Sequence, residues 1–296
     1  MMFEKCSIMV LCADEQQSVR RIEIDTDTQE SICQLFSDAA AELTNDKEKI
    51  EFDGRYKPDQ DEILCISNFQ LSDDIKDAIR DPLGALAYEK VNGEYPAIKV
   101  VFVGARTEDD ETEKFVVAFQ RFRKEQYISA HNINLFWSNN SFRREKEFGL
   151  SISDSIDCCF SDEDLLFTSF FFARQVFDLS GYYRSATTQE VTDFSSNEIL
   201  NIEDTNAFEA MANTSIRRKI AMINDSGVLQ SFSAAEIKRL AQKAGIDLTV
   251  KNKQISIPND KEQIKIILGF LDEEAYKGPF SQVTYLANSK RKVQTK

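Results

Sequence analysis

The sequence predicts an α+β fold in which a strand-rich N-terminal domain precedes a mainly helical C-terminal domain with a β-hairpin. Three observations support this prediction. The chain has 296 residues, of which 42% are hydrophobic, enough for two apolar cores. Short apolar runs, several alternating with polar residues, dominate residues 1–184. From residue 185 the apolar spacing changes to the helical period, so we expect two domains, 1–184 and 185–296.

Apolar and β-branched runs predict the strands of the first domain. They cover residues 6–11, 19–24, 63–66, 98–103, 115–123, 133–137, 148–152, 156–160 and 165–172. Ile32, Phe36 and Leu43 recur at helical spacing, which predicts a helix over residues 28–43. The acidic residues 108–113 predict a solvated loop between two of the strands.

Helical periodicity organises the second domain. It predicts helices over residues 188–194, 204–212, 215–223 and 260–271. A further helix begins at a capping box formed by Ser233 and Glu236 and ends at Gly245. The apolar face of this helix consists of Ile237, Leu240, Ala241 and Ala244. Residues 248–250 and 255–257 predict a hairpin with a basic tip.

Composition excludes several classes of protein. His131 is the single histidine, so metal sites built on several imidazoles are excluded. The ten glycines are never closer than nine residues, so neither a GxGxxG loop nor a Walker loop is present. The six cysteines form no CxxC pair and lie mostly in apolar runs, as core thiols in a reducing compartment do. Apolar segments are too short for a membrane span, and we expect a cytoplasmic protein without a cofactor.

The formal net charge of −14 is unevenly distributed. Residues 1–111 carry −14 and residues 112–210 carry −7, whereas residues 211–296 carry +7. Because ions screen a charge within a Debye length of about 8–10 Å, the local field governs contact with phosphate. The last third of the chain can therefore present a basic face although the chain as a whole is acidic.

Three basic clusters in this last third are candidate DNA contacts, although each alone is also compatible with a solvated face. They consist of Arg217, Arg218, Lys219, Lys238, Arg239, Lys243, Lys251, Lys253, Lys290, Arg291 and Lys292. No recognition-helix, zinc-finger or RRM motif is present, so contacts would be with the phosphate backbone and weakly sequence-specific. Tyr276, Phe280 and Tyr285 could stack on unpaired bases, but we expect them to pack into the core.

No catalytic constellation is visible. The D/E-x-K pairs of metal-dependent nucleases are represented by Asp74–Lys76 and Glu236–Lys238, and both fall in expected helices rather than on adjacent strands. We expect the acidic residues 272–274 to cap a helix or to contact a basic neighbour, because no second acidic cluster lies nearby. His131 has no recognisable flanking motif. The sequence therefore predicts a protein that is not an enzyme.

The C-terminal sequence resembles the KwaB family, the soluble subunit of the Kiwa antiphage defence system. The resemblance is carried by LGFLDEEAY (268–276), GPFS (278–281), Tyr285 and NSKRKV (288–293). The segments DLSGYY (178–183) and SIRRKI (215–220) also look like that family.

The resemblance implies a cytoplasmic protein that binds DNA without strong sequence preference and stops phage DNA replication and late transcription. It implies a multi-pass membrane partner, a KwaA-like protein, which would recruit the chain to the inner face of the cell membrane. The acidic N-terminal half would then face this partner or a second copy of the chain, so we expect a homodimer or higher homo-oligomer. The eleven basic residues come from the charge distribution and not from the family.

Our leading hypothesis is therefore a nonspecific DNA-binding effector of antiphage defence that obstructs polymerase or replisome passage. Two alternatives stay open. One is a metal-dependent nuclease activated by its partner, with an acidic residue such as Asp272 in its site. The other is a protein-interaction adaptor in which the two regions of opposite charge pair with each other or between protomers.

Overall fold

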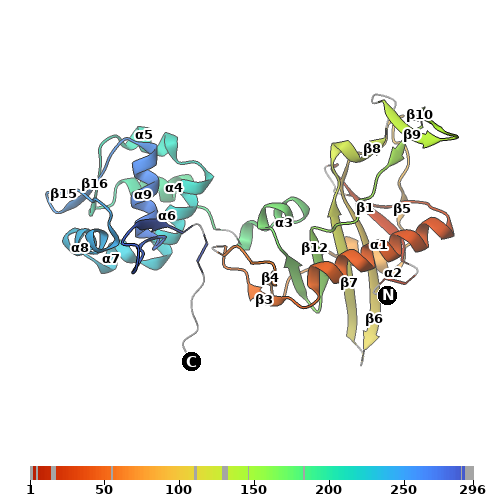
Figure 1. Ribbon diagram of the computed structural model, residues 1–296, viewed down its shortest axis with the longest axis horizontal. Coiled ribbons are helices and arrows are strands. Elements are labelled where there is room, and N and C mark those ends of the chain that lie inside the picture. Colours follow the sequence, from red (N-terminus) through yellow and green to blue (C-terminus); the bar gives the residue numbers. More distant parts are fainter. Residues whose placement is uncertain are drawn as a thin grey trace. The chain divides into compact units, whose positions relative to one another are not determined.

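The chain forms two compact units in this computed structural model (Figure 1). The structure describes residues 3–4, 6–14, 18–54, 56–109, 112–128, 133–145, 147–182, 184–287 and 289–290. Unit 1 comprises Met1–Phe52 and Pro58–Leu179, and unit 2 comprises Asp53–Lys57 and Ser180–Lys296. Strands dominate unit 1 and helices dominate unit 2, which confirms the predicted α+β class. The domain boundary between residues 184 and 185 stays a prediction.

Unit 1 is built on a mixed β-sheet. Its strands are β1 (Ile8–Cys12), β2 (Val19–Arg21), β3 (Glu48–Glu51), β4 (Glu62–Ile66), β5 (Leu86–Ala87), β6 (Ile98–Asp109), β7 (Thr112–Arg121), β8 (Tyr127–Ile128), β9 (Asn134–Ser138), β10 (Ser141–Glu145), β11 (Gly149–Leu150), β12 (Cys158–Ser161) and β13 (Asp164–Phe167). Within the described residues, nine strands form one sheet in the order β3-β4-β13-β12-β7-β6-β1-β2-β5. Strands β9 and β10 form a separate antiparallel hairpin, and β8 pairs with β11.

Helices cover both faces of this sheet because its central strands are apolar on both sides. Helix α1 (Thr26–Thr44) confirms the helix predicted over residues 28–43 and packs Phe36 among side chains such as Val101 on one face. Figure 1 shows α1 lying across the strands. Helix α2 (Asp73–Arg80) contacts β2 and β6, and α3 (Phe170–Val176) contacts β7. The side chains of Val100 and Phe102 point to the α2 face, so the alternation along β6 fills two cores.

The strand predicted over residues 165–172 is wrong in its second half. The run divides into β13, which pairs with β4 and β12, and α3, which begins at Phe170. Both segments are rich in apolar residues, because β13 is buried on both faces and α3 packs Ala173 and Val176 into the core. A short apolar run cannot distinguish a buried strand from a buried helix.

The acidic loop predicted over residues 108–113 is also shorter than expected. Strand β6 extends to Asp109 and β7 begins at Thr112. Glu113 is not a solvated loop residue, because Arg80 Nη2 lies 2.6 Å from its Oε2 and Arg106 Nη1 lies 3.5 Å from its Oε1. Hydrogen bonds from Arg80 lower the pKa of Glu113.

Unit 2 packs helices around a small sheet. Its helices are α4 (Thr188–Ser195), α5 (Thr205–Met211), α6 (Thr214–Ser226), α7 (Val228–Ser231), α8 (Ala234–Ala244) and α9 (Lys261–Leu271). Its strands are β14 (Leu200–Ile202), β15 (Val250–Lys251), β16 (Gln254–Ile257), β17 (Ala275–Lys277) and β18 (Thr284–Leu286). The predicted hairpin is present as β15–β16, and β14 joins it in parallel to β16. Ile220 of α6, Ile237 of α8 and Leu268 of α9 are buried in one apolar cluster.

The predicted boundaries of α8 are confirmed. Ser233 Oγ accepts from the Glu236 amide, and the Glu236 carboxylate accepts from the Ser233 amide at 2.9 Å. Hydrogen bonds from Ser233 lower the pKa of Glu236. Gly245 ends the helix in the left-handed region at φ 76°. Among the described residues, no helix combines the length and the apolar character that crossing a membrane requires.

We expect Gly245→Ala to destabilise unit 2 more than Gly227→Ala, its matched control. Both glycines end helices with positive φ, at 76° and 65°, so alanine costs each about 1–2 kcal/mol in backbone strain. At Gly245 a Cβ would also collide with Thr284 Oγ1, which adds about 1–3 kcal/mol, whereas at Gly227 the nearest atom is 3.9 Å away. Urea unfolding measures both, and equal losses would contradict this packing.

Candidate nucleic-acid interface

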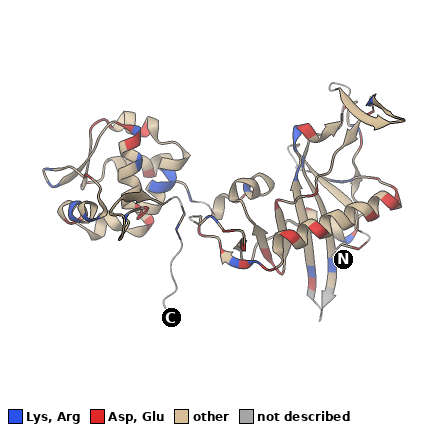
Figure 2. Cartoon of the chain, viewed as in Figure 1, with Lys and Arg blue, Asp and Glu red and all other residues tan. Residues whose placement is uncertain are grey.

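Five of the predicted cations lie on two neighbouring elements of unit 2, α8 and the β15–β16 hairpin. Helix α8 packs against both β15 and β16. Arg239, Lys243, Lys251 and Lys253 are exposed and Lys238 is half-buried. Figure 2 shows basic residues on α8 and at the hairpin. We call these five residues the basic surface.

Helical geometry explains why α8 contributes cations to this surface. Burial of Ile237 and Ala241 fixes the inward side of the helix. At about 100° per residue, Arg239 and Lys243 then lie opposite that side and are exposed, while Lys238 lies at its flank. Leu240, predicted to lie on the apolar face, is 38% exposed because it lies at the other flank.

The hairpin contributes its cations through a tight turn. Asn252 and Lys253 both have positive φ, 51° and 66°, and they connect Lys251 to its cross-strand partner Gln254. Two central residues with positive φ match a type I′ turn, which favours Asn-Gly. Lys253 therefore occupies a position where glycine would be less strained, and this places a cation at the tip.

Two of the three cations of α6 are held by contacts inside unit 2. Arg217 Nε donates to the Ala212 carbonyl at 3.0 Å, and Arg217 Nη1 donates to the Ala186 carbonyl at 3.1 Å. Lys219 forms an ion pair with Glu274. Arg218 is half-buried and also has an interaction. Arg217 and Lys219 are therefore half-buried and engaged in internal contacts, whereas four of the five cations of the basic surface are exposed.

The acidic residues 272–274 contact basic neighbours, as predicted. Lys290 Nζ donates to the Asp272 carbonyl and lies 3.4 Å from its Oδ1, and Asp272 is buried. Glu274 accepts from Lys219. These pairs neutralise two of the three carboxylates. Lys290 is therefore also engaged internally, and the predicted contacts Arg291 and Lys292 lie outside the described residues, as does His131.

Tyr276, Phe280 and Tyr285 do not pack into the core, so that expectation is wrong. Their exposed fractions are 51%, 99% and 43%. Tyr276 and Tyr285 are cross-strand partners on β17–β18, and their rings stack with centroids 5.6 Å apart. The neighbouring Lys277 is exposed too, and sequence reasoning missed it because it stands outside the three basic clusters.

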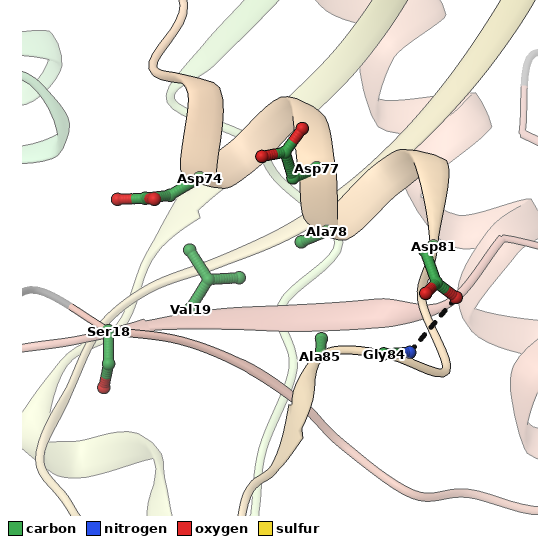
Figure 3. Close-up of a pocket in the computed structure, with 8 residues that line it drawn as sticks. All are labelled: Ser18, Val19, Asp74, Asp77, Ala78, Asp81, Gly84 and Ala85. Atoms are coloured by element: carbon green, nitrogen blue, oxygen red, sulfur yellow. Dashed lines mark hydrogen bonds between the residues drawn. The ribbon is translucent and has the colours of Figure 1, made fainter.

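Unit 1 contains an acidic depression of about 470 Å³ beside α2. Figure 3 shows Asp74, Asp77 and Asp81 along α2 and the turn after it, with Asp81 Oδ1 accepting from the Gly84 amide at 3.1 Å. Asp74 and Lys76 form one of the D-x-K pairs and do lie on a helix. No group of three or more His, Cys, Asp or Glu among the described residues is arranged to hold a metal ion. This depression would repel phosphate.

Comparison with known proteins identifies one family. A family model described as Kiwa protein KwaB-like matches residues 108–281, more than half of the chain. The match includes α8, the β15–β16 hairpin and the tip that carries Phe280. It ends before residues 288–293, the last part of the C-terminal resemblance. Neither the curated proteins nor the solved structures contain a match.

We expect Arg217→Ala to lower the free energy of unfolding by about 2 kcal/mol, because two carbonyls lose charge-assisted hydrogen bonds. The matched control is Arg239→Ala on α8, where the side chain is exposed and the change should stay within about 0.5 kcal/mol. Urea unfolding of both variants measures the difference. Equal stabilities would show that the Arg217 contacts do not hold unit 2 together.

Lys253→Gly should raise the melting temperature while it weakens DNA binding. Glycine relieves the positive φ at this position, worth up to about 1 kcal/mol, and the same change removes a cation from the basic surface. Thermal unfolding and a DNA titration check the two effects separately. A lower melting temperature would contradict the strained turn.

Proposed function

Because the chain belongs to the KwaB-like family of Kiwa antiphage defence proteins, we propose that it binds DNA and thereby blocks phage DNA replication and late transcription. The observation that carries this proposal is the basic surface, where five cations gather although the net charge of the chain is −14. The sequence carries no recognition-helix, zinc-finger or RRM motif, so we expect contacts mainly with the phosphate backbone and weak sequence specificity.

The electrostatics support phosphate binding at this surface. Because ions screen charges beyond about 8–10 Å, the cations of the basic surface themselves determine the field that a phosphate meets there. Release of counterions by about five phosphate contacts gives a log–log salt slope of roughly −4 to −5 on duplex DNA. The affinity therefore falls steeply as salt rises.

We propose that the protein acts as a physical obstacle rather than as an enzyme. Bound protein hinders polymerases without cutting the strand, and this requires only affinity and occupancy. Cleavage of DNA in the test below would instead indicate a nuclease that its partner activates.

Unit 1 is the surface that we propose for protein partners. Its acidity repels DNA and anionic lipid headgroups, but it can meet a basic patch on a KwaA-like membrane protein, which would recruit the chain to the membrane, or on a second copy of the chain. The hairpin β9–β10 exposes Leu135, Trp137 and Phe142. Exposed apolar clusters of this kind mark interaction surfaces.

We expect Arg239→Glu/Lys243→Glu to weaken DNA binding strongly and to make the salt slope shallower by about 2, since two phosphate contacts are lost. The measurement is fluorescence anisotropy with a labelled duplex of about 20 base pairs at several salt concentrations. The matched control is Arg123→Glu/Lys124→Glu, which reverses two exposed cations of unit 1 and should change neither quantity appreciably.

Running each Mg²⁺-containing sample on a gel separates the alternatives. Intact DNA with salt-sensitive binding supports the obstacle proposal. Cut DNA would replace it with the nuclease. No binding at any salt concentration, with an assembly size that changes with salt, would replace it with the protein-interaction adaptor.

A further inference from the structure

The hairpin β17–β18 presents two tyrosine rings on one face and a phenylalanine ring at its tip. Tyr276 and Tyr285 face each other across the two strands, and Phe280 stands at the tip with 99% of its surface exposed. We call Tyr276, Phe280 and Tyr285 the aromatic face. Each tyrosine residue is about half exposed. Large aromatic side chains that are exposed side by side often mark a surface that binds another molecule.

This face is held in a defined position. On the opposite side of the hairpin, Thr284 Oγ1 donates to the Ala244 carbonyl at 3.0 Å, and Ala275 packs against the core of unit 2. Tyr285 Oη donates to Ser281 Oγ at 3.2 Å. A Cβ on Gly278 would lie 2.9 Å from Tyr285 Cε2, so glycine lets this ring close over the turn.

The geometry of the two rings suits stacking on their outer sides. Their centroids are 5.6 Å apart with an interplanar angle of 27°, too close for another ring to enter between them. Each ring is stacked on the other with one side, and the exposed fractions of 51% for Tyr276 and 43% for Tyr285 leave part of each ring open to a ligand. A nucleobase is a flat ligand with a π-face, and every base has one.

The positive charge near this hairpin indicates which flat ligand binds the aromatic face. The hairpin is anchored at the C-terminal end of α8, where Lys243 of the basic surface lies in the last turn. Strand β17 packs against α8. The exposed Lys277 follows Tyr276 and lies on the opposite face of the hairpin, together with its cross-strand partner Thr284. The hairpin that carries the aromatic face is thus next to the helix that carries part of the basic surface. Aromatic rings on one element beside cations on the next suit a single strand whose phosphates and bases contact different elements.

We propose that the aromatic face stacks unpaired bases, so that unit 2 prefers single-stranded DNA to duplex. The bases of a duplex are stacked on one another and cannot reach the tyrosine rings, whereas the phosphates of both forms reach the basic surface. This inference rests on the proposed function and names the form of DNA that the protein recognises.

The test compares three labelled probes of equal length in anisotropy titrations of the full-length protein: oligo-dT, a duplex, and an oligomer of abasic sites. We expect oligo-dT to bind most tightly. We expect Tyr276→Ala/Tyr285→Ala to weaken its binding about tenfold or more, because each lost stack costs at least severalfold in affinity. Binding of the abasic oligomer, which offers phosphates without bases, should change less than about twofold.

Two controls isolate the stacking contribution. Tyr276→Phe/Tyr285→Phe keeps both rings and should retain the affinity for oligo-dT, which loss of folding would not allow. Trp137→Ala/Phe142→Ala removes an exposed aromatic pair from the β9–β10 hairpin of unit 1, with ring centroids 5.0 Å apart, and should leave binding unchanged.

Failure of the inference and failure of the proposed function give different results. Equal, salt-sensitive binding of all three probes, unaffected by the tyrosine substitutions, would overturn stacking and leave phosphate binding intact. Binding of none of them would overturn both. A loss caused only by the Trp137 and Phe142 substitutions would move the base contact to unit 1 and overturn the present assignment.

Discussion

The burial of one stripe of each helix in unit 2 determines what the neighbouring cations can do. On α6, burial of Ile216 and Ile220 places Arg217 and Lys219 at the flanks of the stripe, about 100° to either side, where carbonyls and carboxylates of the unit are within reach. On α8 the same rule places Arg239 about 160° and Lys243 about 120° from Ile237 around the helix axis, and both side chains are exposed. Two clusters of similar composition therefore have different uses, one structural and one available to phosphate.

The internal ion pairs also set the local field around the basic surface. Lys219 and Lys290 neutralise Glu274 and Asp272, two carboxylates that would otherwise repel a phosphate backbone approaching β17. Partly buried pairs of this kind respond less to salt than exposed charges do. In the proposed function, the salt dependence of DNA binding is then determined by the exposed cations, because the partly buried pairs change little with salt. Removing a buried cation would both destabilise unit 2 and expose a repulsive carboxylate.

The sequence predicts most of the fold and about half of the candidate site. The α1 and α8 helices, the β15–β16 hairpin and the α+β class follow from local periodicity and capping, because these depend on residues a few positions apart. The pairing of β14 with β16 and of Lys219 with Glu274 joins residues more than 50 positions apart, and no local pattern encodes it. The exposure of Tyr285 escaped prediction for a related reason. A two-stranded hairpin buries one face, and only the docking of Thr284 on α8 decides which one.

In the proposed function the protein obstructs replication and transcription, and both processes open the duplex. Electrostatic attraction alone does not select the opened strands, because a duplex carries about twice as many phosphates per length as a single strand does. Each added cation raises the affinity for both forms of DNA. Stacking on Tyr276 and Tyr285 adds free energy only where bases are unpaired, and it depends less on salt than the basic surface does. In the proposed function, the combination selects for DNA structure without selecting for sequence. In a chain with net charge −14, stacking would also add to the affinity that the five cations of the basic surface provide.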